Sequence, residues 1–367
     1  MVKIMKKFVL SILAFIFLFS CASQSDEVVI GAIFPLTGDY SSMGESYLSA
    51  LEIAAEQANV KFIVENEGSC DVKSALTAAQ KLVTIDKVDF LIGPVCLITF
   101  NAVLPFAEEN NIAMFGPSVD QTIIDEQSET YKNVAVGLYP AFHKTWYQLA
   151  EEAYKKGKKI AVLQTVDEGP ERNVAKFTDK YEELGGDIIL HERVDAGTKD
   201  FRTLLLKLDN LAKKKSGLII WPHLARDDRI LFYKQKDELN VLQGAYLLGD
   251  LFIDLELQPF LDALGEETLE GVISTTYKDA MSEEFKKALK NKFNVDPVLG
   301  TDNVYDAVVH GSEISKDCNK NSECIISRFK NTDYAGVSGK LEFDETGNRV
   351  GTVVTRILNN GTFVIKN

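Results

Sequence analysis

Apolar and polar positions alternate along most of the chain in blocks whose spacing predicts strands and helices in succession. Up to residue 115, short apolar runs typical of buried strands are followed by segments with apolar residues every three or four positions, the spacing of a one-sided helix. Strands are expected at Glu27–Phe34, Val60–Glu65, Phe90–Ile92 and Ala113–Phe115, and helices at Gly44–Asn59, after the N-cap Asp71, and at Ala102–Glu109. This order predicts a parallel sheet with helices on both faces.

The same rhythm restarts after Tyr139-Pro140 and predicts a second sheet of the same kind. Its strands are expected at Lys159–Gln164, Asp187–Val194, Gly217–Trp221 and Gln243–Leu248, and its helices at Ala141–Lys156, Glu171–Leu184, Phe201–Lys213 and Asp227–Glu238. Further helices are expected at Ser282–Asn294, Asn303–Ser315 and around Ile325–Lys330, and closing strands at Ser338–Phe343, Thr352–Leu358 and Thr362–Lys366. The last two strands flank Asn359-Asn360-Gly361, which favours a hairpin turn.

The first 25 residues have the pattern of an export signal followed by a lipid attachment site. Three lysines precede an apolar run from Phe8 to Phe19, which is too short to span a bilayer and has the length of a signal-peptide core. Leu18-Phe19-Ser20-Cys21 resembles the lipobox of bacterial lipoproteins, and residues 22–25 form a small polar tether. We therefore expect residues 1–20 to be removed and Cys21 to carry a lipid that anchors the protein outside the cytoplasm. The alternative is an ordinary signal peptide with an incidental cysteine.

Composition describes a soluble, acidic body and excludes several classes of function. The net charge of −14 becomes −17 when the three lysines of the signal are removed, which argues against a nucleic-acid partner. The sequence contains none of the nucleophile, phosphate-loop, zinc-protease or dinucleotide motifs, so we expect no enzyme and no cofactor. The four histidines are scattered and no C-x-x-C pair exists, so we expect no metal site.

Four cysteines remain once Cys21 is assigned to the anchor, and an even number outside the cytoplasm predicts two disulfides. Three pairings are possible from the sequence alone. Cys318 and Cys324 are close enough to close one local loop, which would leave Cys70 to pair with Cys96.

Several segments together resemble the leucine/isoleucine/valine-binding family of periplasmic proteins. They are Ile30–Gly38, Met43–Glu45, Leu91–Cys96, Ile112–Ser118, Ala161–Leu163, Asp167–Gly169 and Val304–Val308. Each motif is weak alone, but they follow in order over essentially the whole mature chain. Some members of the family also carry a disulfide where Cys70 and Cys96 lie.

The resemblance implies a type I periplasmic-binding fold, with two Rossmann-like α/β lobes joined by three crossovers near residues 138–140, 271–275 and 334–338. Lobe 1 would comprise residues 26–138 and 274–334, and lobe 2 residues 139–273 and 335–367. The expected function is capture of a small amino-acid-like or amide ligand, with closure of the lobes, for an ABC-type importer whose permease subunits are partners. We expect a monomer. The alternative function is a ligand-sensing lipoprotein that reports to a membrane receptor.

Candidate ligand contacts are residues that follow predicted strands. They are Tyr40, Met43, Leu97, Thr99, Ser118 and Asp120 in lobe 1 and Glu168, Trp221 and Asp250 in lobe 2. Several of them have a second, simpler interpretation: packing of the loop for Tyr40 and Met43, a helix N-cap for Asp120, and a core position for Trp221. Trp221-Pro222-His223 ends a strand expected to face the cleft, and the simpler interpretation of His223 is an ordinary surface residue. Asp250 matches a loop position that often supplies a carboxylate for an ammonium group in the family.

The chain departs from the family at the expected carboxylate site. Relatives commonly have serine after the position of Cys96, whereas this chain has Leu97 and Ile98, which offer only backbone N–H groups. Burying a carboxylate without the lost hydroxyl would cost about 1–3 kcal/mol. We therefore expect leucine, isoleucine and valine to bind weakly or not at all, and a ligand with an apolar body and an amino, amide or hydroxyl donor to bind better. The alternative is that Thr99 takes over the missing role.

Overall fold

The computed structural model describes residues 27–366 except 39 and 167, so Cys21 and its lipobox lie outside the described residues. Contacts divide the chain into two compact units. Unit 1 contains the described residues up to Phe115 together with 133–135 and 304–329, and unit 2 contains residues 116–132, 136–303 and 330–367. The lobe boundaries expected from the sequence stay a prediction.

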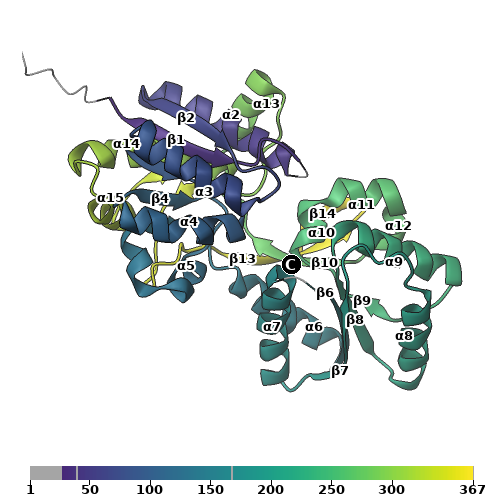
Figure 1. Cartoon of the computed structure of the whole chain (residues 1–367). Helices are drawn as coiled ribbons and strands as arrows, with labels where there is room; N and C mark the ends of the chain where they lie inside the picture. The colour runs from purple at the N-terminus through teal and green to yellow at the C-terminus, as the bar shows by residue number, and fades with distance from the viewer. Residues whose placement is uncertain (1–26, 39, 167, 367) are drawn as a thin grey trace, which may run out of the picture. The chain divides into compact units, whose positions relative to one another are not determined.

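The elements alternate between strands and helices in both parts of the chain (Figure 1). The first part contains β1 (Val29–Phe34), α2 (Ser41–Ala58), β2 (Lys61–Asn66), α3 (Val72–Gln80), the π-helical turn η1 (Lys81–Ile85), β3 (Phe90–Ile92), α4 (Leu97–Glu109), β4 (Ala113–Gly116), α5 (Gln121–Gln127), the 3-10 turn η2 (Glu129–Asn133) and β5 (Ala135–Gly137). The middle part contains α6 (His143–Lys156), β6 (Lys159–Thr165), α7 (Glu168–Glu183), β7 (Asp187–Val194), α8 (Arg202–Lys214), β8 (Leu218–His223), α9 (Arg226–Leu239) and β9 (Tyr246–Leu247).

The last part contains α10 (Leu251–Leu255), α11 (Leu257–Leu264), α12 (Glu266–Leu269), β10 (Ile273–Tyr277), α13 (Glu283–Phe293), α14 (Thr301–Asp317), α15 (Ser322–Lys330), β11 (Ala335–Gly336), β12 (Gly339–Lys340), β13 (Val353–Asn359) and β14 (Thr362–Ile365).

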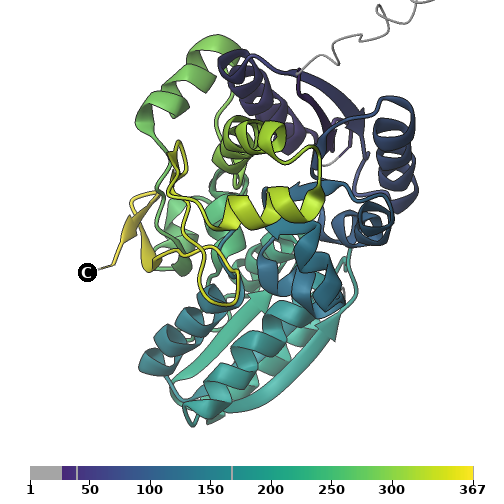
Figure 2. The same ribbon diagram turned by 90° about the vertical axis from the view of Figure 1, so that its left-hand side faces the viewer.

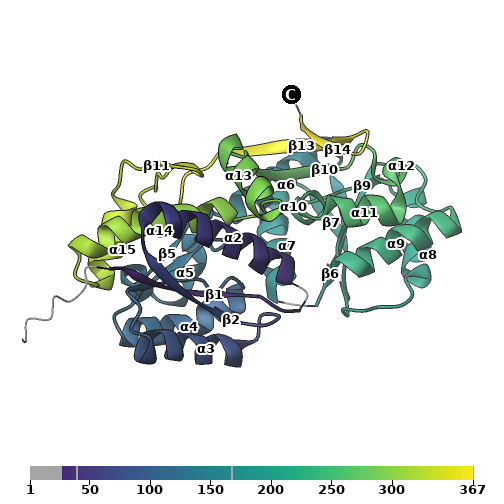
Figure 3. The same ribbon diagram turned by 90° about the horizontal axis from the view of Figure 1, so that it is seen from above.

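Most of the first parallel sheet lies in unit 1, in the strand order β2-β1-β3-β4-β5. Helices α3 and α4 cover one face, and α2, α14 and α15 cover the other (Figure 3). On the second face Phe115 packs edge-on against Phe90 and lies tilted against Phe329 of α15. Phe90 and Phe115 point the same way because Phe90 is in register with Ala113, two residues before Phe115. The predicted parallel sheet covered on both faces is confirmed.

Unit 2 contains a second parallel sheet in the order β7-β6-β8-β9, with α6 and α7 on one face and α8 and α9 on the other (Figure 1). Side chains of the buried strand β6 contribute to the hydrophobic core on both faces of the sheet. Ile160 and Val162 join the core under α6 and α7, whereas Ala161 and Leu163 join the core under α8 and α9. Such continuous apolar runs are expected of strands buried on both sides.

The chain ends on a β-hairpin that extends the antiparallel sheet β10-β13-β14 (Figure 2). Asn359 pairs with Thr362, so the turn consists of Asn360 and Gly361, whose φ angles of 48° and 70° suit a type I′ turn. The hairpin is confirmed. The predicted strand Ser338–Phe343 is mostly wrong, because its pairing is limited to Gly339–Lys340, with Ala335–Gly336, and to an isolated bridge between Phe343 and Arg349.

Three short helices, α10 to α12, were not predicted, and helix α4 begins five residues earlier than predicted, at Leu97. The earlier start places Leu97 and Thr99 in the first turn of a helix rather than in a loop. Among the described residues, none of the helices combines the length and apolar character needed to cross a bilayer.

Both predicted disulfides are present, which selects one of the three pairings. Cys70 bonds Cys96 and Cys318 bonds Cys324, and the Cα atoms lie 5.6 Å apart in each pair. Both bonds lie in unit 1.

Candidate functional site

The carboxyl ends of β2, β1 and β3 lie at one edge of the first sheet, because these strands are parallel neighbours. Ligands of open α/β sheets bind at this edge. Asn66 ends β2 and Glu67 follows it, and both bind the segments that follow the two other strands. Asn66 accepts hydrogen bonds from the amides of Leu36, at 2.9 Å, and Gly68, at 2.8 Å, and its side-chain amide donates to Thr37. It therefore fixes the loop after β1 to the end of β2.

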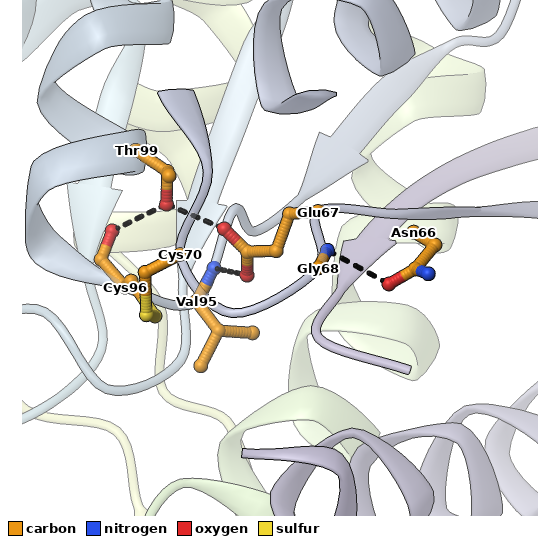
Figure 4. Close-up of a disulfide and its surroundings, with 7 residues drawn as sticks. All are labelled: Asn66, Glu67, Gly68, Cys70, Val95, Cys96 and Thr99. Carbon is orange, nitrogen blue, oxygen red and sulfur yellow. Dashed lines mark hydrogen bonds between the residues drawn. A yellow bond between two sulfur atoms is a disulfide. The ribbon is translucent and has the colours of Figure 1, made fainter. Parts of the chain in front are cut away.

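Glu67 is completely buried and binds the start of helix α4 (Figure 4). Its Oε1 accepts from the amide of Val95 at 2.8 Å, and its Oε2 accepts from the hydroxyl of Thr99, which also lies 2.9 Å from the carbonyl oxygen of Cys96. Burial raises the pKa of Glu67, and the hydrogen bonds from Thr99, Val95 and the Cys96 amide oppose this rise. A side-chain carboxyl group of the protein itself thus occupies donors at a helix N-terminus, where anions are favoured.

The Cys70–Cys96 disulfide holds the same two segments together (Figure 4). Cys96 is the N-cap residue of α4, and Asp71, next to Cys70, caps α3 by accepting from the amide of Ser74 at 2.8 Å. The predicted N-cap role of Asp71 is confirmed. The segment after β2 is therefore joined to the start of α4 by one covalent bond and by the hydrogen bonds of Glu67.

The predicted contacts of unit 1 lie on two segments that follow β1 and β3. Tyr40 is the N-cap residue of α2 and is 47% exposed, and Met43, in the first turn, is half-buried. Leu97 is half-buried at the start of α4, and Thr99 is buried against Glu67. Gly44 allows α2 to begin this close to β1, since a Cβ atom there would lie 2.2 Å from the carbonyl oxygen of Pro35.

Asp120 is a helix cap, as one of its two interpretations predicted. Its Oδ1 accepts from the amide of Ile123 at 3.2 Å, and its Oδ2 accepts from the amide of Phe142 at 2.9 Å. Burial raises its pKa, and these two amides oppose the rise. Both oxygens therefore bind backbone donors of unit 2. Ser118, two residues earlier, is half-buried.

In unit 2, the sequence-predicted residues Trp221 and Asp250 come together in a buried network at the carboxyl end of β8. Oδ2 of Asp250 accepts from Nε1 of Trp221 at 3.1 Å and from Nδ1 of His223 at 2.8 Å. Its Oδ1 accepts from Nη1 of Arg229 at 2.8 Å and from the amide of Phe252 at 3.0 Å. The interpretation of His223 as a surface residue is wrong, because its side chain is 2% exposed and bonded to Asp250.

The charges of this network balance within the protein. Burial pushes the pKa of Asp250 upward, but Arg229 and His223 outweigh burial and hold the pKa well below its usual range. For His223, burial lowers the pKa and outweighs the opposite effect of Asp250. The network therefore contains one carboxylate, one guanidinium and a neutral imidazole. Trp221 is fully buried in the core of unit 2, as its simpler interpretation predicted.

Aromatic rings pack against His223. Trp146 meets the imidazole edge-on at 5.3 Å between ring centroids, and Phe252 lies 5.7 Å away and is 39% exposed. The Nε2 atom of His223 lies 3.5 Å from the side-chain amide of Asn173, a long contact. Gly249, before Asp250, allows close packing, because a Cβ atom there would lie 2.5 Å from the carbonyl oxygen of Ile273.

Sequence reasoning missed Glu67, Arg229, Asn173, Trp146 and Phe252. Only the position of Glu67, directly after a strand, could have marked it in advance. Glu168 begins helix α7, earlier than predicted, and its side chain lies outside what the structure describes. Over the described ranges, no group of three histidine, cysteine, aspartate or glutamate residues is placed to hold a metal ion.

Comparisons with known proteins agree on one family. The model of the family described as periplasmic binding protein matches residues 27–355. A leucine-, isoleucine-, valine-, threonine- and alanine-binding protein of Pseudomonas aeruginosa is 25% identical over 346 residues, which cover 89% of this chain and 88% of that protein.

Solved structures show the same fold. A leucine-binding protein of Thermotoga maritima superposes with a TM-score of 0.72 at 24% identity, covering 93% of this chain and 98% of that chain. A solute-binding protein of an ABC transporter from R. palustris, in complex with 4-hydroxybenzoate, superposes with a TM-score of 0.74 at 18% identity, covering 93% and 96%.

Proposed function

Because the chain belongs to the periplasmic binding protein family, we propose that it captures a small organic solute outside the cytoplasm and delivers it to the permease of an ABC-type importer. The names of its relatives support this, since they include amino-acid-binding proteins and solute-binding proteins of ABC transporters. The proposed function requires binding and release without a chemical change in the solute. It also requires only one copy of the chain, and we propose a monomer.

The proposed form of the protein is a lipoprotein anchored through Cys21. The order of basic residues, apolar run, Leu18-Phe19-Ser20-Cys21 and polar tether supports it. The two disulfides agree with an oxidising compartment outside the cytoplasm.

The proposed ligand has an apolar body and a hydrogen-bonding group, and it is not a simple branched-chain amino acid. The observation that carries this proposal is the position of Glu67. Its carboxyl group takes the Val95 amide and the Thr99 hydroxyl at the start of α4, the place where the family resemblance puts the carboxylate of an amino acid. The alternative in which Thr99 replaces the missing serine is weakened, because its hydroxyl already binds Glu67 and lies near the Cys96 carbonyl.

A ligand carboxylate at the same helix start would meet two unfavourable terms. It would lie near the carboxyl group of Glu67, which already takes the donors of Val95 and Thr99, so it would compete for them. It would also lack a side-chain hydroxyl beside Leu97, and an unpaired buried acceptor costs about 1–3 kcal/mol. Together these costs would move an affinity from the micromolar range toward the millimolar range, since about 1.4 kcal/mol is a tenfold change.

Titration calorimetry with leucine tests the proposal directly. We expect a dissociation constant weaker than micromolar for the native protein. The variant Leu97→Ser restores a hydroxyl at the start of α4, so it should improve the affinity for leucine more than the affinity for leucinamide, which lacks the carboxylate. Leu97→Ala is the matched control, because it removes the same bulk without adding a hydroxyl. Micromolar or tighter binding of leucine to the native protein would overturn the proposed ligand class.

A further inference from the structure

The buried network around Asp250 fixes which nitrogen of His223 carries a proton. Nδ1 of His223 lies 2.8 Å from Oδ2 of Asp250. The other oxygen of this carboxylate, Oδ1, is paired with Arg229. A neutral imidazole in this position donates from Nδ1, which leaves Nε2 as a hydrogen-bond acceptor. Since Asp250 accepts from four donors, its carboxylate is saturated within the protein.

Two polar atoms, one on His223 and one on Trp146, whose rings lie 5.3 Å apart, remain poorly satisfied. Nε2 of His223 has only the 3.5 Å contact with Asn173, which exceeds the usual length of a hydrogen bond. Nε1 of Trp146 is buried and has no hydrogen-bond partner among the described residues. Buried polar atoms are nearly always paired in folded proteins, so an unpaired one calls for an explanation. An acceptor on His223 and a donor on Trp146 are together suited to one group that both donates and accepts.

The same rings supply an apolar contact surface. The centroids of Trp146 and Phe252 lie 6.1 Å apart, and each ring also packs against His223. Phe252 is the part of this cluster that reaches solvent, whereas Trp146 is 2% exposed. Ligand sites commonly combine aromatic walls with a few placed polar atoms.

We propose that Trp146, His223 and Phe252 form a ligand subsite on unit 2 that binds an uncharged hydroxyl or carboxamide group attached to an apolar or aromatic body. Asp250 is then a positioning residue that holds the His223 tautomer and does not pair with a ligand ammonium group. This inference rests on the proposed solute-binding function, and it names the chemistry of one part of the ligand.

A thermal-shift series measures the preference for this end group. The probes share an isobutyl or phenyl body and differ only in carrying a carboxamide, hydroxyl, ammonium or carboxylate group. We expect carboxamide or hydroxyl members to stabilise the native protein, with a shift that grows with concentration. Stabilisation by the ammonium members above all others would overturn the inference and leave the proposed function standing. If neither this series nor a broad set of amino acids, peptides and organic acids binds, the proposed function itself fails.

Variants that remove Nε1 of Trp146 or Nε2 of His223 test the subsite, and their affinity is measured for the probe that stabilises the native protein most. Trp146→Phe removes the unpaired N–H and should weaken binding about tenfold, the effect of one lost hydrogen bond. His223→Asn keeps a donor for Asp250 but removes Nε2, and it should weaken binding similarly. Trp221→Phe is the matched change for the other tryptophan. It removes an N–H that is bonded to Asp250, so it should lower the unfolding free energy, which Trp146→Phe should change less.

Phe252→Leu provides a variant at low risk of misfolding, because Phe252 is partly exposed. It should weaken the binding of the phenyl probes more than the binding of the isobutyl probes. Unchanged affinity of the best probe in Trp146→Phe, His223→Asn and Phe252→Leu would refute the subsite.

The positioning role of Asp250 is visible without any ligand. Imidazole ¹⁵N chemical shifts should show the proton of His223 on Nδ1 in the native protein. In Asp250→Asn the side-chain amide can donate to Nδ1, so the imidazole proton should move to Nε2. Nε2 would then donate, and the protein should bind probes whose end group accepts a hydrogen bond better than probes whose end group donates one. A native His223 protonated at Nε2 would contradict the assignment.

Discussion

The two disulfides of unit 1 should contribute unequally to its stability, because they close loops of different length. Cys70 and Cys96 are 26 positions apart, and Cys318 and Cys324 are 6 apart. In the loop-entropy description the stabilisation grows with the logarithm of the loop length, which gives about 3.5 kcal/mol for the first bond and about 2.2 kcal/mol for the second. The difference of about 1.3 kcal/mol follows from the ratio of the two lengths alone.

The surroundings of the bonds favour the same order. Cys70–Cys96 joins the start of α3 to the start of α4, beside the buried Glu67 and its bonds to Val95 and Thr99. Losing this bond also loosens that hydrogen-bonded contact. Cys318–Cys324 joins the end of α14 to the neighbouring helix α15, two elements that are already close in sequence. The entropic difference is therefore a lower bound on the expected difference.

The double variants Cys70→Ser/Cys96→Ser and Cys318→Ser/Cys324→Ser allow a direct comparison, because both bonds lie in unit 1. Both tryptophans, Trp146 and Trp221, lie in unit 2. Their fluorescence therefore follows the unfolding of unit 2 and not that of unit 1, which contains the disulfides. Hydrogen exchange followed by mass spectrometry, over a guanidinium series, resolves the opening free energy of unit 1 by peptide. The native protein under reducing conditions is the control for the combined loss of both bonds.

We expect the first variant to lose more stability than the second by at least about 1 kcal/mol, while peptides of unit 2 change little in either. Equal losses, or a larger loss in the Cys318/Cys324 variant, would refute the reasoning from loop length. A loss that appears equally in unit 2 would show that the two units unfold together.

Two further predictions concern the lipid anchor and a buried lysine at the end of α15. Cys21→Ser should move the protein from the membrane fraction to the soluble fraction of cells, and an unchanged distribution would reject the lipobox. Burial lowers the pKa of Lys330 to about 8, so Lys330→Met should raise the unfolding free energy at pH 7, by at most about 3 kcal/mol. The unfolded lysine keeps its proton up to about pH 10.5, so the gain should fade as the pH rises from 8 to 10.5; a gain that does not depend on pH would mean that packing, not charge, causes it.

Sequence patterns predicted those features of the fold that depend on neighbouring residues. The buried strands β6 and β8 and the helices beside them follow from local spacing, and the Asn360-Gly361 turn follows from its residue types. Helices α10 to α12 are 5, 8 and 4 residues long, too short for a periodic pattern to emerge. Helix α4 was predicted late because its first turn, Leu97 to Phe100, has no N-cap side chain to mark it.

The site could be predicted only in part, because its decisive contacts join distant segments. Glu67 and Val95 are 28 positions apart, and Asp250 and His223 are 27 apart. A sequence shows that a carboxylate follows a strand, but not whether it points to a ligand or to its own protein. For Asp250 the family resemblance favoured an ammonium partner, whereas the structure supplies Arg229, which lies in the predicted helix Asp227–Glu238 and was not among the candidate residues.

The proposed uncharged ligand group agrees with the electrostatics of the strand ends in spite of the acidity of the chain. A protein with a net charge of −14 attracts cations at long range, but steering does not supply a partner at close range. The carboxyl group of Glu67 is occupied in unit 1, and that of Asp250 is saturated in unit 2. An ammonium group would therefore lose its hydration at these strand ends without gaining a carboxylate, and a ligand carboxylate would find the Val95 amide and the Thr99 hydroxyl already taken by Glu67. Hydrogen-bonding groups without charge avoid both costs, because they lose less hydration and can satisfy Nε2 of His223 and Nε1 of Trp146.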